Sequence, residues 1–265
     1  MKSFRYVTLD PTGNITCLVL DPVEESERSR VTSALMEQCE QVGYLQKPHQ
    51  PGAKARLQMM GGEFCGNATM AAASYLAQQE RAAGNTVVLF EVSGANELVS
   101  CAVAPLADDL WQGTVRMPSI QEILPFTLGE YDAVLVRMEG IAHLILQDIR
   151  LDAKTAETLL LISAGELPDA SVGLLQWNSR TNYMKPLVFV KKSGTLVWET
   201  GCGSGSTAIG AWLASKKRDG ITAIDIQQPG GIIRAEAEAN NGLVTDIRIT
   251  GRVRIGKTET LCLEG

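Results

Sequence analysis

The sequence lacks the features that mark nucleic-acid-binding and membrane proteins. Its net charge is −6 and no long run of basic residues occurs, which argues against a nucleic-acid partner. No apolar run approaches membrane-spanning length, and the first residues include no hydrophobic segment of the signal-peptide kind. We therefore expect no membrane contact and a cytoplasmic location.

Metal-binding and nucleotide-binding patterns are also missing. The chain has only two histidines, His49 and His143, and its six cysteines (17, 39, 65, 101, 202 and 262) include no C-x-x-C pair. A zinc site is therefore not expected, and in the cytoplasm these cysteines should be reduced. No glycine-rich phosphate-binding fingerprint is complete, so we expect no nucleotide either.

What the sequence does contain is one segment that occurs twice. Residues 61–77 and residues 199–214 each place a lone Cys after glycine and run into an Ala-rich apolar stretch. Superposing Cys65 on Cys202 also aligns several further positions: Gly66 with Gly203, Ala71 with Ala208, Leu76 with Leu213 and Ala77 with Ala214. The two copies lie about half the chain apart, which favours an internal duplication.

A cysteine at the start of a helix has a definite chemistry. A helix N-terminus presents unpaired N–H groups and a partial positive charge, so it should lower the pKa of the thiol. The same N–H groups can hold a carboxylate, and the flanking glycines let a ligand approach the backbone. Each turn therefore predicts a reactive thiol beside an anion site.

Two such turns on opposite faces of one ligand would suit removal of a proton from one face of a carbon and delivery to the other. This is the arrangement of a two-base racemase or epimerase. Two other interpretations remain open: each Cys could be a small buried apolar residue, or Cys65 and Cys202 could form a disulfide.

Hydrophobic periodicity predicts an α+β fold with two halves. The helical patterns cover residues 26–38 and 153–161 and the stretches after the two Cys turns. The expected strands cover residues 4–9, 15–20, 56–60, 86–92, 97–104, 113–117, 133–138, 143–147, 172–177, 184–191, 195–199, 222–227, 231–237 and 244–249. We place one half at residues 1–118 and the other at 119–253, with a linker near 118–129 and a tail at 254–265 that returns to the first half.

The paired Cys motifs resemble those of the diaminopimelate epimerase superfamily over essentially the full chain. Within it, the chain is most similar to the histidine racemases of staphylopine-type metallophore synthesis. The resembling stretches are residues 11–14, 39–43, 63–70, 198–199, 202–205 and 228–231. The resemblance implies two pseudo-symmetric halves, each a curved, mostly antiparallel sheet around a central helix. It also implies a homodimer and a cofactor-independent mechanism that uses two cysteines.

The resemblance assigns roles to individual residues. Cys65 and Cys202 correspond to the base and acid that act on an amino-acid substrate. The positions that correspond to substrate contacts are Asn14, Glu40, Gln41, Gly66, Asn67, His143, Glu199, Thr200, Gly203 and Ser204.

Several of these residues also have simpler interpretations. Asn14 could be a turn residue, Glu199 a helix N-terminal charge, His143 a buried core histidine and Glu40 a solvated surface charge.

Three positions depart from the diaminopimelate epimerase pattern. Ile141, Ser171 and Thr200 stand where those enzymes have the amides and the Arg that hold the second carboxylate of their substrate. Without a cation, a second carboxylate has no partner, which favours an amino acid with one carboxylate, histidine first. The alternatives are a diaminopimelate epimerase, a racemase of another amino acid, an isomerase of the phenazine-biosynthesis type and a non-catalytic amino-acid-binding protein.

Overall fold

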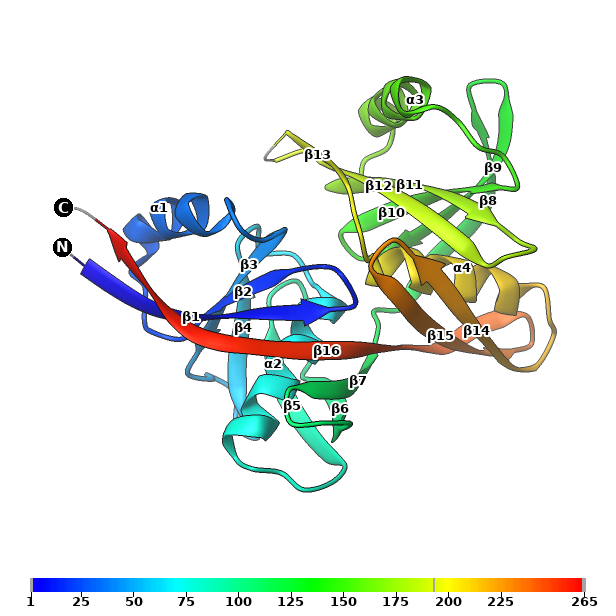
Figure 1. The fold of residues 1–265 in the computed structure, drawn as a ribbon. Helices are drawn as coiled ribbons and strands as arrows, with labels where there is room; N and C mark the ends of the chain where they lie inside the picture. Colours follow the sequence, from blue (N-terminus) through cyan, green and yellow to red (C-terminus); the bar gives the residue numbers. More distant parts are fainter. Residues whose placement is uncertain (1, 193, 264–265) are drawn as a thin grey trace. The chain divides into compact units, whose positions relative to one another are not determined.

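The computed structural model describes residues 2–192 and 194–263 and divides the chain into two compact units. Unit 1 comprises Met1–Arg116 and Thr250–Gly265, and unit 2 comprises Met117–Ile249. Each unit contains one of the two repeated Cys segments. The structure has a mixed α/β fold (Figure 1).

Unit 1 is built from strands, with one short surface helix and one buried helix. Its elements are β1 (Lys2–Pro11), β2 (Thr16–Val19), α1 (Glu25–Leu35), β3 (Gln41–Gln46), β4 (Ala55–Met59), α2 (Gly66–Gln79), β5 (Thr86–Val92), β6 (Val99–Pro105), β7 (Leu110–Arg116) and the later part of β16 (Leu243–Leu263).

The strands of unit 1 form a closed ring. β1 to β7 pair in chain order, and β16 pairs with β7 on one side and with β1 on the other. In Figure 1, β16 (red) accordingly runs along β1 (blue), with Ser3 opposite Cys262 and Pro11 opposite Val253. Segments far apart in the sequence thus complete an eight-stranded barrel.

Helix α2 is buried along most of its length. Eleven of its fourteen residues are buried, and the helix packs against β1, β2, β5, β6 and β7. Alanines at positions 71, 72 and 73 give it a narrow surface that the strands can approach closely. This confirms the prediction of a buried Ala-rich helix after Cys65, since a helix that is apolar on all sides belongs in a core.

Unit 2 also contains one mostly buried helix and one helix packed on its sheet. Its elements are β8 (Ile120–Leu128), β9 (Tyr131–Met138), β10 (Ile141–Gln147), α3 (Ala153–Glu166), β11 (Ser171–Asn178), β12 (Tyr183–Val190), β13 (Thr195–Trp198), α4 (Gly203–Ser215), β14 (Gly220–Gln228), β15 (Gly231–Asn240) and the earlier part of β16.

The sheet of unit 2 runs in the order β16-β15-β14-β12-β11-β10-β9-β8, with β13 paired to β12. The β10–β11 pair is parallel, and α3 connects the two strands. Helix α4 packs against β9, β10, β14 and β15 and is itself mostly buried. Helix α3 packs on β11 and β12, with Ala156, Leu160 and Ala164 in the core.

The expected linker at residues 118–129 is wrong, because most of it forms strand β8. Its side chains do not alternate cleanly between buried and exposed, so the sequence lacks the alternation of apolar and polar residues by which strands are recognised. Strand β3 was also missed. The tail expected at 254–265 to return to the first half forms, up to residue 263, the later part of β16, which pairs with β1 in unit 1.

Candidate active site

Cys65 is the N-cap residue of α2. Its backbone is extended (φ −133°, ψ 110°), and its sulfur accepts a hydrogen bond from the Ala68 N–H at 3.4 Å. The Thr69 hydroxyl donates to the Cys65 carbonyl oxygen at 2.8 Å. The half-buried sulfur therefore lies at the positive end of the helix dipole.

A side-chain amide faces this thiol. The Cys65 thiol donates to Gln41 Oε1 at 3.2 Å, while Gln41 Nε2 donates to Asn14 Oδ1 at 2.8 Å and to Thr16 Oγ1 at 2.7 Å. Because Nε2 has two acceptors, the amide orientation is fixed and its oxygen must face the sulfur. Thr16 was not predicted as a site residue, although its position directly after Asn14 and Ile15 could have suggested it.

Asn14 connects this amide to two further predicted site residues. Its Nδ2 donates to Glu40 Oε2 at 2.8 Å, and its Oδ1 also accepts from Asn67 Nδ2 at 3.3 Å. Asn14, Gln41 and Asn67 are all buried. The structure thus brings Asn14, Glu40, Gln41, Cys65 and Asn67 into one hydrogen-bonded network, and Gly66 is the first residue of α2.

Cys202 caps α4 in the same way. Its backbone is extended (φ −115°, ψ 106°), and its sulfur accepts from the Gly205 N–H at 3.3 Å. The Ser206 hydroxyl, at the position of Thr69 in the first copy, donates to the Cys202 carbonyl oxygen at 2.9 Å. A Cβ at Gly205 would lie 2.9 Å from a Leu175 methyl group and 3.2 Å from the sulfur, so this position favours glycine.

The surroundings of the two sulfurs differ. Cys202 is only 3% exposed, and burial raises its pKa well above the ordinary value. The Glu199 carboxylate raises the pKa further, through its charge and through a hydrogen bond with the thiol. The expectation that the helix start lowers the thiol pKa is therefore wrong for Cys202, because desolvation outweighs the helix terminus.

Ser204 links Cys202 to His143. Ser204 Oγ lies 3.5 Å from the Cys202 sulfur and 2.9 Å from His143 Nε2. His143 is fully buried, which lowers its pKa to about 3, so the imidazole is neutral near pH 7. Its Nδ1 has no hydrogen-bond partner within the described part of the chain.

The imidazole occupies a space that a glycine provides. Gly173 lies opposite His143 in the β10–β11 pair, and a Cβ there would be 2.2 Å from His143 Nδ1. Any larger residue at position 173 would therefore displace the ring. Gly173 was not predicted as a supporting residue.

The three departures from the diaminopimelate epimerase pattern also lie in unit 2. Ile141 and Ser171 are directly paired in the β10–β11 register, and Thr200 precedes the Cys202 turn, where its carbonyl oxygen accepts from Gly230 N–H at 2.7 Å. Gly203 is the first residue of α4. Unit 2 thus joins His143, Glu199, Cys202 and Ser204 in one cluster.

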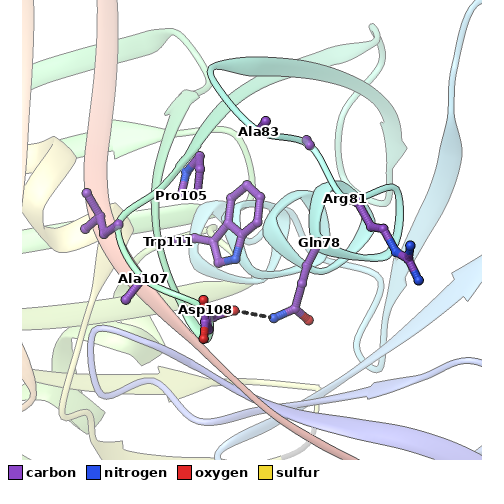
Figure 2. Close-up of a pocket in the computed structure, with 9 residues that line it drawn as sticks. Gln78, Arg81, Ala83, Pro105, Ala107, Asp108 and Trp111 are labelled. Carbon is purple, nitrogen blue, oxygen red and sulfur yellow. Dashed lines mark hydrogen bonds between the residues drawn. The ribbon is translucent and has the colours of Figure 1, made fainter.

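A cavity of about 390 Å³ lies elsewhere in unit 1, beside the end of α2 and the β6–β7 turn. In Figure 2 the Trp111 indole lies in its middle, and Gln78 donates to the Asp108 carbonyl oxygen at 2.8 Å. None of its lining residues is a predicted site residue, so this cavity is not part of the Cys65 network.

Among residues 2–192 and 194–263, no group of three or more His, Cys, Asp or Glu side chains could hold a metal ion. No described helix is long and apolar enough to cross a bilayer. All six cysteines are free thiols.

Solved structures share this fold at low sequence identity. A phenazine biosynthesis protein of the PhzF family from Bacillus anthracis superposes with a TM-score of 0.75 at 14% identity, covering 99% of this chain and 100% of that one. A hydroxyproline epimerase from Agrobacterium vitis gives 0.74 at 15% identity, covering 100% and 94%. A probable proline racemase from Agrobacterium radiobacter gives 0.72 at 15% identity, covering 98% and 93%.

Curated relatives are similar in sequence along nearly the whole chain. A histidine racemase from Staphylococcus aureus is 28% identical over 259 residues, covering 92% of each chain. A histidine racemase from Fusobacterium nucleatum is 29% identical over 266 residues, covering 95% of this chain and 97% of the relative. The family model described as "Histidine racemase CntK N-terminal domain" matches residues 3–260. The chain therefore belongs to the histidine racemase family.

Proposed function

We propose that this protein interconverts L- and D-histidine with two cysteine thiols and no cofactor. Membership of the histidine racemase family makes it an amino-acid isomerase. The observation that carries the two-thiol mechanism is that Cys65 and Cys202 cap their helices with the same geometry, one in each unit.

The proposed reaction is a transfer of protons at the α-carbon. A thiolate removes the α-proton from one face, the other thiol delivers its proton to the opposite face, and the two sulfurs exchange protonation states. The N–H groups that begin α2 and α4 hold the substrate carboxylate, including those of Gly66, Asn67, Gly203 and Ser204. Such proton transfer needs both groups in position, because an α-proton is only weakly acidic.

The two thiols are not equivalent. Burial and Glu199 favour the protonated form of Cys202, so we assign to it the role of acid in the resting enzyme. Cys65 is less buried and lies at the start of α2, so we assign to it the role of first base. Its thiol donates to Gln41 Oε1, so in this mechanism the substrate would take the place of that contact.

Two features of the site bear on the substrate side chain: the missing cation for a second carboxylate, and the hydrogen-bond donors and acceptors around Asn14. Ile141, Ser171 and Thr200 provide no cation for a second carboxylate, so diaminopimelate should bind poorly. An imidazole needs one donor and one acceptor, which Asn14, Glu40 and Gln41 can supply as one network.

We also infer the wider setting of the reaction from the resemblance. The two units are the functional halves, each a curved sheet wrapped around its own helix, α2 or α4. The protein acts in the cytoplasm as a homodimer, and D-histidine made by it would serve metallophore synthesis.

The test is a panel of L-amino acids assayed for D-product by chiral chromatography, with solvent D₂O to detect α-proton exchange. L-histidine should give the highest kcat/KM, and LL-diaminopimelate should give little or none. Efficient turnover of diaminopimelate would overturn the argument from the missing clamp. Preference for another neutral amino acid would overturn histidine alone, and binding without any exchange would identify a non-catalytic binding protein.

A further inference from the structure

The backbone of Cys202 is held by a closed ring of three hydrogen bonds. Its N–H donates to Gln228 Oε1 at 2.6 Å, and Gln228 Nε2 donates to Ser206 Oγ at 2.9 Å. The Ser206 hydroxyl then donates to the Cys202 carbonyl oxygen at 2.9 Å. One side-chain amide and one hydroxyl thus fix both polar atoms of the Cys202 peptide backbone.

The donor and acceptor assignment of this ring is unambiguous. The Cys202 N–H can only donate, so the Gln228 oxygen must face it and the Gln228 amide nitrogen must face Ser206. Ser206 is four residues after Cys202, and its bond to the carbonyl is the usual back-bond of a helical serine. Gln228 supplies the acceptor for the Cys202 N–H, which no residue of α4 provides.

Gln228 reaches Cys202 from a neighbouring segment. It is the last residue of β14, is fully buried, and is followed by the turn whose Gly230 N–H donates to the Thr200 carbonyl oxygen at 2.7 Å. The turn at residues 228–230 therefore forms hydrogen bonds with the backbone of two residues, Thr200 and Cys202.

A buried glutamine contacts each of the two cysteines, but through different atoms of the cysteine. In unit 1 the amide of Gln41 contacts the Cys65 sulfur itself. In unit 2 the amide of Gln228 contacts the Cys202 backbone and leaves the sulfur to Ser204, Gly205 and Glu199. The hydrogen bonds of Gln228 thus hold the backbone that carries the thiol and do not involve the sulfur itself.

We propose that Gln228 is the positioning residue of Cys202: it fixes the backbone of the N-cap and so aims the thiol. This role deepens the proposed racemase function and rests on it. The backbone torsions of the N-cap determine where the sulfur lies relative to the N–H groups that start α4. Because proton transfer depends steeply on geometry, a small displacement of the sulfur slows the reaction without weakening binding.

The variants separate positioning from general stability. Gln228→Met keeps the size of the side chain and removes both hydrogen bonds to the ring. Ser206→Ala opens the ring at another point and retains the acceptor for the Cys202 N–H. Gln176→Met is the matched control, because Gln176 is a buried glutamine of unit 2 that accepts from the Leu151 N–H at 2.8 Å.

Gln228→Met should lower kcat for the amino-acid substrate by roughly 10- to 100-fold with little change in KM. Ser206→Ala should show the same pattern to a smaller extent, and Gln176→Met should keep the wild-type kcat. All three should unfold at a somewhat lower temperature than the wild type. A loss of kcat that follows the loss of stability equally in all three variants would overturn the positioning role.

A second readout does not depend on the racemase proposal. The rates at which a small neutral thiol reagent modifies Cys202 and Cys65 are measured by peptide mass spectrometry across pH. Gln228→Met should change the rate profile of Cys202 several-fold and leave that of Cys65 unchanged. An unchanged Cys202 profile would overturn the inference, even if the wild type proves to racemise no amino acid.

Discussion

At the scale of single residues, the duplicated turn places two chemically identical side chains in unlike surroundings. Cys65 faces an amide within a polar network, whereas Cys202 is buried beside a carboxylate and a hydroxyl. In the proposed mechanism one thiol is protonated while the other is not, and the unequal surroundings of the two sulfurs are consistent with this difference.

The first prediction concerns the two thiols. Cys65→Ser and Cys202→Ser should each lower racemisation roughly 10²- to 10⁴-fold, the usual contribution of a positioned acid or base. The serine hydroxyl can still cap the helix, so the fold should persist. Chiral chromatography measures turnover and thermal unfolding checks the fold. Wild-type turnover in either variant would show that two thiols are not required.

The second prediction concerns His143. The folded protein keeps this imidazole neutral down to a pKa of about 3, while the unfolded chain protonates it near 6.5. The unfolded state then binds the extra proton, so this group contributes stability above pH 6.5 that is lost as the pH falls toward 3.

Urea unfolding at several pH values measures the effect. Between about pH 6 and 3.5, the wild type should lose about 1.4 kcal/mol per pH unit more than His143→Gln does. Parallel stability curves for the two proteins would show that the histidine is protonated in the folded state.

At the scale of elements, the sequence predicted best what depends on local chemistry. Both helices after the Cys turns were expected, because glycine, a capping side chain and an apolar run coincide there. Strands β5 and β6 were also expected, at residues 86–92 and 97–104. Strand β3 was missed because residues 41–46 are buried without alternation.

For the candidate site, too, the sequence predicted residues close to a motif better than residues far from one. Side chains next to a Cys motif, such as Asn67 and Ser204, could be assigned from the sequence. Gln228 and Thr16 were not assigned a role, because their contacts with the site join residues that lie 26 and 25 positions apart in the sequence. The raised pKa of Cys202 was not predicted either, since the burial of a residue cannot be read from a repeated motif.

The third prediction concerns the pairing of β1 with β16. The register shifts between Val7 and Leu9, and a Cβ at Gly256 would lie 2.6 Å from the Thr8 carbonyl oxygen. Gly256→Ala should therefore lower the free energy of unfolding by about 1–3 kcal/mol. Gly84→Ala is the control, because no atom lies within 4 Å of a Cβ there. Equal denaturation midpoints for the two variants would contradict the close approach.

At the scale of the whole molecule, each unit contains one cysteine that caps a mostly buried helix. We propose that the two thiols of a catalytic site come from a single chain. The fourth prediction follows: mixing equal amounts of Cys65→Ser and Cys202→Ser, with time for subunits to exchange, should restore no racemisation. Recovery of about a quarter of wild-type turnover would instead place the two thiols of one site on different chains, because half of the dimers would be mixed and each mixed dimer would have one intact site.

The path of β16 has a consequence for how the protein is made. Unit 1 begins the chain, but its barrel is closed by residues 250–263, and residues 117–249 of unit 2 lie between the two parts. During synthesis, β1 and β7 therefore leave the ribosome before the strand that pairs with both of them, because that strand is translated only after residues 117–249. Domains usually fold in the order in which they emerge. Here the second unit can complete its fold before the first. Until β16 pairs with them, β1 and β7 are two unpaired sheet edges of the nascent first unit, and a chaperone could bind there.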